Sequence, residues 1–231
     1  MNIKGLHKTS LIDYPGKICS IIFTGGCNLR CKYCHNPELA CDSCNLQTIT
    51  NDDVLSFIKE RGSLIDGISI SGGEPTLAKN LFDFIRSVKD IPLAVKIDTN
   101  GLNPEVIDHL IQNRLIDYVA IDIKTSPEKY EGLTNRKVDF SRIVRTVDLV
   151  RASDVDYELR TTCIPSFVTL EDFESIKGEI GHVKQYFIQQ FINNVTLDPS
   201  LSNCEPYPLS VLYSFRDFVR SFSDICEIRG I

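Results

Sequence analysis

The chain has 231 residues, of which 42% are hydrophobic, and a formal net charge of −6 at pH 7. This length and composition allow a sizeable buried core, and we expect a single domain over residues 1–231. The acidic balance and the absence of any Lys/Arg-rich run argue against nucleic acid as a partner. No window is apolar over the length of a transmembrane helix, and residues 1–10 lack the apolar segment of a signal peptide, so we expect no membrane partner and a cytoplasmic protein.

The first predicted element is an N-terminal hairpin. Residues 3–14 lead into the turn sequence Asp-Tyr-Pro-Gly at 13–16, in which proline fixes φ and glycine relieves the turn. Residues 17–24 are nearly all apolar, as expected for a strand that is covered on both faces. Cys19 lies inside this strand, and we interpret it as a small buried hydrophobic residue.

Three cysteines with the spacing Cys-x3-Cys-x2-Cys follow this strand: Cys27, Cys31 and Cys34. A [4Fe-4S] cluster normally takes four cysteine ligands, so three leave one iron able to bind a small molecule. The alternative is a structural zinc loop with a fourth ligand from His35, Cys41 or Cys44. Zinc sites usually repeat a Cys-x2-Cys pair, and therefore the spacing favours the cluster.

Cysteine usage points to a reducing compartment. The chain has nine cysteines, and five of them lie between Cys27 and Cys44. An odd number crowded into one segment argues against a secreted disulfide framework and for metal ligation.

From residue 50 onward the pattern alternates between helix and strand. After the strand at 17–24, further apolar strands are predicted at residues 67–71, 93–98, 118–123, 157–162 and 184–191. Helices are predicted at 50–61, 79–89, from 103 onward, and at 141–151, 170–180 and 208–222. Six strands that are each followed by a helix indicate an α/β fold with a parallel sheet, either an incomplete barrel or an open doubly wound sheet.

Polar residues gather at the ends of these strands. In both topologies the functional site lies at the carboxyl ends of the strands. Beyond the cysteine loop, the strand ends carry residues 71–75 (Ser-Gly-Gly-Glu-Pro), 98–101 (Asp-Thr-Asn-Gly), 122–124 (Asp-Ile-Lys), 160–162 (Arg-Thr-Thr) and 189–190 (Gln-Gln). We therefore expect these sets to line one site.

Each set has a chemical and a structural interpretation. Gly72 and Gly73 could let backbone groups approach a charged ligand, or could simply form a tight turn. Asp98 could bind a ligand or cap the next helix. Asp122 and Lys124 share a face of their strand, so they could hold a zwitterion or form a plain ion pair.

Two further side chains remain ambiguous on residue type alone. Arg160 offers a fork for a carboxylate or a ribose, or forms a surface salt bridge. His35 could ligate zinc or pack over a bound base.

Taken in order, these motifs resemble the radical S-adenosylmethionine (SAM) enzymes, and within them the activating enzymes of glycyl-radical proteins. The resemblance covers nearly the whole chain. The segments at 13–16 and at 34–37 (Cys-His-Asn-Pro) are similar to the activase branch. The chain looks most like the activating proteins of anaerobic ribonucleoside-triphosphate reductase. The resemblance implies an incomplete (βα)6 parallel barrel with an N-terminal hairpin.

The resemblance also implies roles for individual residues. The cysteine triad would hold three irons of a [4Fe-4S] cluster, and the amino and carboxylate groups of SAM would chelate the fourth. The amino group would be bound by Gly72, Gly73 and Glu74, the carboxylate by Lys124, the ribose by Asp122, and the adenine by the backbone around Tyr33, Cys34 and His35. Arg160 and Gln190 complete the expected cofactor contacts, and Asp98 with Asp122 frames a monovalent cation in some relatives.

The implied reaction is reductive cleavage of SAM, followed by removal of a hydrogen atom from a glycine of the partner. The expected partners are a glycyl-radical enzyme, with anaerobic ribonucleotide reductase as the first candidate, and a flavodoxin- or ferredoxin-type electron donor. Three alternatives stay open: a different glycyl-radical enzyme as client, radical chemistry on a small molecule, and a zinc-stabilised interaction module without catalysis.

Two features depart from the family pattern. Relatives commonly have Gln before Gly-Cys, where this chain has Thr-Gly-Gly at 24–26. Cys41 and Cys44 form an additional pair, and we favour a second metal site there. The pair could bind zinc or an auxiliary cluster with distant thiols, act as a redox pair, or have no role; the distant thiols are Cys163, Cys204 and Cys226.

Overall fold

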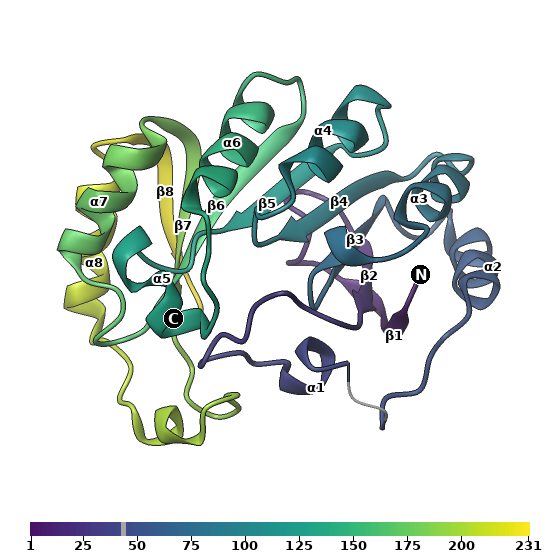
Figure 1. Ribbon diagram of the computed structural model, residues 1–231. Helices are drawn as coiled ribbons and strands as arrows, with labels where there is room; N and C mark the ends of the chain where they lie inside the picture. Colours follow the sequence, from purple (N-terminus) through teal and green to yellow (C-terminus); the bar gives the residue numbers. More distant parts are fainter. Residues whose placement is uncertain (43–44) are drawn as a thin grey trace. The chain divides into compact units, whose positions relative to one another are not determined.

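The computed structural model describes residues 1–42 and 45–231 (Figure 1). The chain forms two compact units, each assembled from separate stretches of sequence. The first unit comprises Met1–Asn28, Glu38–Thr99 and Glu105–Val119, and the second comprises Leu29–Pro37, Asn100–Pro104 and Ala120–Ile231. The expectation of a single domain stays a prediction.

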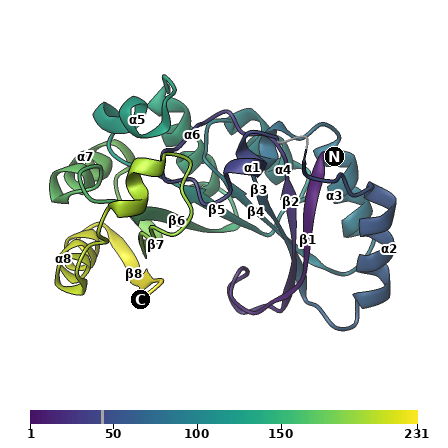
Figure 2. The same ribbon diagram turned by 90° about the horizontal axis from the view of Figure 1, so that it is seen from below.

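The strands are hydrogen-bonded in the order in which they occur in the sequence. They are β1 (Ile3–Ser10), β2 (Cys19–Thr24), β3 (Gly67–Gly72), β4 (Ala94–Thr99), β5 (Tyr118–Asp122), β6 (Asp156–Cys163), β7 (Val183–Gln190) and β8 (Ser223–Arg229). The predicted N-terminal hairpin is confirmed, because β1 pairs with β2 antiparallel (Figure 2). In the first unit β2, β3 and β4 are parallel, and in the second β6, β7 and β8 are parallel. The strand β5 passes from the first unit into the second.

The helices follow the predicted alternation. They are α1 (Pro37–Ala40), α2 (Asn51–Arg61), α3 (Leu81–Lys89), α4 (Pro104–Gln112), α5 (Pro127–Thr134), α6 (Phe140–Arg151), α7 (Leu170–Ile180) and α8 (Leu209–Val219), with 3-10 turns η1 (Pro75–Leu77) and η2 (Pro199–Asn203). Thr50 caps α2, because its hydroxyl accepts the Asp53 N–H at 3.1 Å. Among residues 1–42 and 45–231, no helix is long and apolar enough to cross a bilayer.

Each strand from β2 to β7 is followed by a helix, which confirms the six predicted strand–helix units of a partial parallel barrel. The prediction does not include the helices α1 and α5, the two 3-10 turns or the strand β8. The predicted helix at 208–222 ends at Val219, after which the chain forms β8. This last strand pairs parallel with β7, and α8 lies beside it (Figure 1).

Alternation along the strands separates an apolar face from a charged face. In the first unit Val95 and Ile97 of β4 are fully buried, while Lys96 and Asp98 point to the opposite face. In the second unit Leu159 of β6 is buried on the helix-covered side, and its neighbours Glu158 and Arg160 form ion pairs on the other face. Among the predicted site residues, Asp98 lies on the charged face of the first unit and Arg160 on that of the second.

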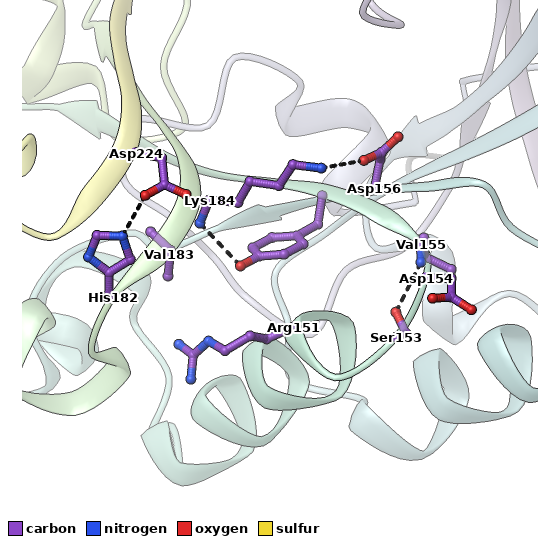
Figure 3. Close-up of a pocket in the computed structure, with 10 residues that line it drawn as sticks. Arg151, Ser153, Asp154, Val155, Asp156, His182, Val183, Lys184 and Asp224 are labelled. Carbon is purple, nitrogen blue, oxygen red and sulfur yellow. Dashed lines mark hydrogen bonds and ion pairs between the residues drawn. The ribbon is translucent and has the colours of Figure 1, made fainter.

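A cavity of about 490 Å³ lies within the second unit, at the amino-terminal ends of its strands (Figure 3). Ion pairs cross its wall, between His182 and Asp224 at 2.8 Å and between Lys184 and Asp156 at 2.8 Å. It contains none of the predicted cofactor residues. These pairs join residues at the starts of neighbouring strands and are more than half exposed to solvent, so each contributes little to stability.

Candidate active site

The cysteine loop begins in the first unit, where backbone hydrogen bonds fix its entry. The Gly26 N–H donates to Leu39 O at 2.8 Å, and the Cys27 N–H donates to Ala40 O at 3.1 Å. The acceptors belong to α1, the short helix that follows the loop. Cys27 therefore occupies a defined position at the edge of this unit.

The Gly-Gly-Glu turn after β3 packs directly on this entry. The Gly73 N–H donates to Thr24 O, and the Glu74 N–H donates to Gly26 O, both at 2.8 Å. A Cβ on Gly73 would lie 2.1 Å from Gly26 O, and one on Gly72, whose φ is +115°, would lie 2.4 Å from Thr24 N. The lack of a side chain at Gly72 and Gly73 therefore allows the turn to pack against the backbone of Thr24 and Gly26, which supports the structural interpretation of both glycines. Their role in binding SAM stays a prediction.

Glu74 is held inside the first unit. Its side chain is nearly inaccessible, with 2% of the residue exposed. Its Oε1 accepts hydrogen bonds from the Thr76 N–H at 3.1 Å, the Thr76 hydroxyl at 2.6 Å and the Thr99 hydroxyl at 2.8 Å. The carboxylate therefore ties the turn after β3 to the end of β4.

The second half of the cysteine loop is anchored in the second unit by α5. The Arg30 N–H donates to Thr134 O at 2.9 Å, and the Lys32 N–H donates to Leu133 O at 3.0 Å. The Asn135 side-chain amide adds a bond to Arg30 O at 3.0 Å. The helix that the sequence did not predict is thus the element that positions Cys31 and Cys34.

Aromatic residues surround this half of the loop. Tyr33 is buried in a cluster with Leu133, Ile164, Phe191 and Leu201. The ring of His35 stacks on Phe191, with centroids 6.2 Å apart, and its Nδ1 lies 2.8 Å from Val195 O. His35 is exposed, and the Tyr33 ring lies edge-on to it with centroids 6.4 Å apart.

The cysteines themselves suit cluster ligation. Among the described residues, Cys27, Cys31 and Cys34 are half-buried and form no disulfide, and Cys41 is exposed. Cys27 belongs to the first unit, and Cys31 and Cys34 belong to the second. Over the described ranges 1–42 and 45–231, no group of three or more His, Cys, Asp or Glu side chains is already arranged as a metal-ion site. Thiolate is the ligand type that a [4Fe-4S] cluster binds, and the assignment of these three cysteines to the cluster stays a prediction.

The proposed second metal gains no support from two of the three distant thiols. Cys163 and Cys226 are buried, and burial raises the pKa of both thiols, that of Cys226 to about 12. Such thiols resist the deprotonation that metal binding requires. Cys44 lies outside the described residues, so the second site stays a prediction.

Asp122 and Lys124 meet on one face of the second unit, as their spacing predicted. Lys124 Nζ lies 3.0 Å from Asp122 Oδ2, and Arg160 Nε lies 2.7 Å from Asp122 Oδ1. Burial alone would raise the pKa of Asp122, but the Arg160 guanidinium and then the Lys124 ammonium hold it well below its usual range. Burial would lower the pKa of Lys124, and Asp122 raises it well above its usual value instead. The site therefore presents a fixed positive group, 5.9 Å from the centre of the Tyr33 ring.

Two residues that the sequence did not single out extend this network. Glu158 is 1% exposed, and its carboxylate accepts hydrogen bonds from Arg229 Nη1 at 2.8 Å and from Arg229 Nη2 at 2.9 Å. Arg229 also stacks on Phe187, 3.4 Å from the ring centre. Glu158 Oε1 lies 3.7 Å from Arg160 Nη1, so β8 supports the orientation of Arg160. The alternation of Glu158 and Arg160 along one strand indicates that both side chains lie on the same face. Arg229 could not be placed beside them from the sequence, because the strand β8 that carries it was not predicted.

Gln190 is the last residue of β7, and its two side-chain polar groups differ in their hydrogen bonding. Its amide nitrogen donates to Tyr207 O at 2.8 Å. Its Oε1 is buried and finds no hydrogen-bond partner within the described part of the chain. A buried acceptor of this kind is normally paired, so a donor on a bound ligand would complete it. This is consistent with the predicted cofactor contact.

Removing either Lys124 or Asp122 should weaken SAM binding and leave the cluster intact. One charged hydrogen bond contributes about 1.5–3 kcal/mol, so the affinity of Lys124→Ala and of Asp122→Ala should fall about tenfold or more. Calorimetric titration of the anaerobic protein with SAM measures this. The matched control is Lys184→Ala, which breaks an ion pair of similar length at the other strand ends (Figure 3). Unchanged affinity in both site variants would refute the assignment.

Comparison with known proteins places these observations in a family. The Radical SAM superfamily model matches residues 21–179. The chain is 40% identical over 197 residues to a Methanocaldococcus jannaschii protein provisionally named glycyl-radical enzyme activating enzyme, covering 82% of this chain and 79% of that protein. It is 32% identical over 163 residues to a Listeria monocytogenes pyruvate formate-lyase-activating enzyme, covering 62% of this chain and 63% of the relative.

Solved structures agree on the fold. Streptococcus suis SuiB bound to S-adenosylmethionine has a TM-score of 0.65 at 14% identity, covering 89% of this chain and 48% of SuiB. The family match also argues for an enzyme and against a zinc-stabilised interaction module. The chain therefore belongs to the radical SAM superfamily, whose members use a [4Fe-4S] cluster and S-adenosylmethionine, and within it to the glycyl-radical enzyme activating enzymes.

Proposed function

We propose that this protein installs the radical of a partner glycyl-radical enzyme, and that the partner is an anaerobic ribonucleoside-triphosphate reductase. The observation that carries the activase function is the 40% identity to the M. jannaschii relative over 79% of that protein. The segments at 13–16 and 34–37 resemble the activase branch as a whole, and the named client rests on the likeness of the chain to the activating proteins of anaerobic ribonucleoside-triphosphate reductase.

The described residues supply the groups that both cofactors need. Three irons would be held by the thiolates of Cys27, Cys31 and Cys34. SAM would be held by Lys124 at its carboxylate, by Asp122 at its ribose, by residues 72–74 at its amino group, and by the backbone near Tyr33, Cys34 and His35 at its adenine. Arg160 would act with Asp122, and Gln190 would supply its buried acceptor. We keep the monovalent cation apart from this list, because Asp98 already carries a positive partner.

When bound, the cluster and SAM supply the one-electron cleavage that generates a carbon radical able to take a hydrogen atom from a glycine. The chain's own residues provide position and charge. Lys124 stays protonated because Asp122 stabilises its charge, so it can pair with a carboxylate across the neutral pH range. Arg160 fixes Asp122 by a 2.7 Å bond, and Glu158 with Arg229 limits the movement of Arg160. The reducing electron would come from a flavodoxin- or ferredoxin-type donor.

The client is tested with the complete reaction under anaerobic conditions. Reduced protein, SAM and anaerobic ribonucleotide reductase should yield 5′-deoxyadenosine and a stable glycyl radical, visible by electron paramagnetic resonance. The physical reason is that a glycine loop of the partner completes the site and excludes water from the reactive carbon. A Gly→Ala change at the partner's target glycine should abolish the signal, while slow uncoupled cleavage of SAM continues.

The possible outcomes separate the two parts of the proposal. A radical that forms only on another glycyl-radical enzyme keeps the activase function and overturns the named client. Turnover that needs a small molecule, with no protein partner supporting a radical, overturns the activase function itself.

A further inference from the structure

A buried lysine occupies the charged face of the first unit beside one of the predicted site residues. Lys96 lies two positions before Asp98 on β4, so both side chains point to the same face of the sheet. Lys96 is 1% exposed, and its ammonium forms an ion pair with Asp98 Oδ1. The side chain of Asp98 is only 14% exposed. The two groups therefore form a largely desolvated pair at the end of a central strand.

The surroundings of Lys96 leave Asp98 as its ionic partner. Ser69 of β3 lies opposite Lys96 in the register of the two strands. The Ser69 hydroxyl is buried and has no hydrogen-bond partner among the described residues. Cys19 lies near enough to respond to the charges of Lys96 and Asp98, but burial, followed by Asp13, raises its pKa to about 11, so its thiol is neutral at physiological pH. A buried ammonium is costly unless a carboxylate pairs with it, and Asp98 fills that role here.

This pair conflicts with the monovalent cation that the family resemblance suggests at Asp98. A sodium or potassium ion needs the carboxylate oxygens as ligands and brings a positive charge of its own. The ammonium of Lys96 already contacts that carboxylate, and a second cation beside it would meet like-charge repulsion in a poorly solvated place. The residues present therefore do not fit a separate monovalent cation at Asp98.

We propose that Lys96 is a built-in counter-ion that replaces the monovalent cation, so that SAM binding by this protein is independent of sodium and potassium. The ammonium carries the same single charge as those ions and is covalently held at the position where it is needed. It neutralises Asp98 without an entropy cost for recruiting an ion from solution. This inference rests on the proposed function and on the expectation, from the family resemblance, that Asp98 belongs to the SAM site.

The test is the affinity for SAM of the anaerobic holoprotein, measured by calorimetric titration at constant ionic strength. Tetramethylammonium chloride, an ion too large for the site, is compared with sodium chloride and potassium chloride. The wild-type affinity should vary less than about twofold among the three salts. A wild-type affinity that rises tenfold or more with potassium or sodium would overturn the proposal without needing any variant.

The variant Lys96→Met keeps the length of the side chain and removes its charge. Its affinity for SAM should fall about tenfold in tetramethylammonium, because Asp98 then lacks a counter-ion. The affinity should return toward the wild-type value when potassium or sodium is added, because either ion can bind beside Asp98 in the space that the ammonium occupied. Lys89→Met is the matched control: it removes a lysine that pairs with Asp117 in the same unit, and it should show no cation dependence.

A purely structural role for Lys96 gives a different result. In that case Lys96→Met lowers the melting temperature and the affinity, and no alkali cation restores either, which overturns the proposal. The readout does not involve a client enzyme. Failure of the activase function and failure of this inference are therefore distinguishable.

Discussion

Replacing Cys27, Cys31 or Cys34 by alanine should abolish the cluster and all cleavage of SAM. Each cysteine is half-buried and would hold one iron, so a missing ligand leaves two protein bonds to a cluster that requires three. Anaerobic preparations of the wild type should contain about four irons and a matching amount of acid-labile sulfide per chain. The variants should contain neither at a significant level, and they should form no 5′-deoxyadenosine.

The control for this loss is another cysteine in the same unit as Cys27. Cys19 is fully buried in β2, and burial raises its pKa, so it remains a neutral thiol within the core. Cys19→Ala should keep both the cluster and the activity. Wild-type protein that carries zinc and no sulfide would contradict the cluster assignment.

The site residues that the sequence revealed share a simple signal. Asp122 and Lys124 follow an apolar strand two residues apart, and alternation alone puts them on the same face. The ion pair in the structure agrees with this. The ends of the strands could be predicted because a run of apolar residues changes abruptly to polar residues at each of them.

The unexpected elements lack that contrast. The sequence of α5, Pro-Glu-Lys-Tyr-Glu-Gly-Leu-Thr, has few apolar positions and a glycine, so no helical stripe stands out. The strand β8, Ser-Asp-Ile-Cys-Glu-Ile-Arg, mixes charged and apolar residues, as is common for the edge strand that it forms in the described part of the sheet. Their tertiary contacts determine their structure, and those contacts position Cys31, Cys34 and Arg160.

The Gly-Gly-Glu turn shows a second limit of sequence-based inference. Glycine at 72 and 73 predicted a close approach, but it could not identify the approaching group. In the structure that group is the backbone of Thr24 and Gly26, at the entry to the cysteine loop. Glycines in a predicted binding motif can therefore be required because a neighbouring loop packs against the backbone at those positions.

This contact makes Gly73→Ala a severe change. The added Cβ would lie 2.1 Å from Gly26 O and 2.6 Å from Gly26 C, and both are backbone atoms that cannot rotate away. Overpacking against backbone should cost about 3 kcal/mol or more, which lowers the melting temperature by about 6–12 °C in a chain of this size. Relief of the clash requires movement of Gly26, which precedes Cys27 and accepts the Glu74 N–H. The iron content should therefore fall together with the stability.

Gly178→Ala is the matched control, because this glycine lies in α7 with no atom within 4 Å of the added Cβ. Alanine is favoured over glycine inside a helix by about 0.5–1 kcal/mol, so this variant should melt about 1–4 °C higher than the wild type and retain full iron content. Thermal unfolding followed by circular dichroism, with iron analysis of the same samples, measures both effects. A Gly73→Ala protein with wild-type melting and iron content would show that the turn does not support the cysteine loop, and the steric argument would then be wrong.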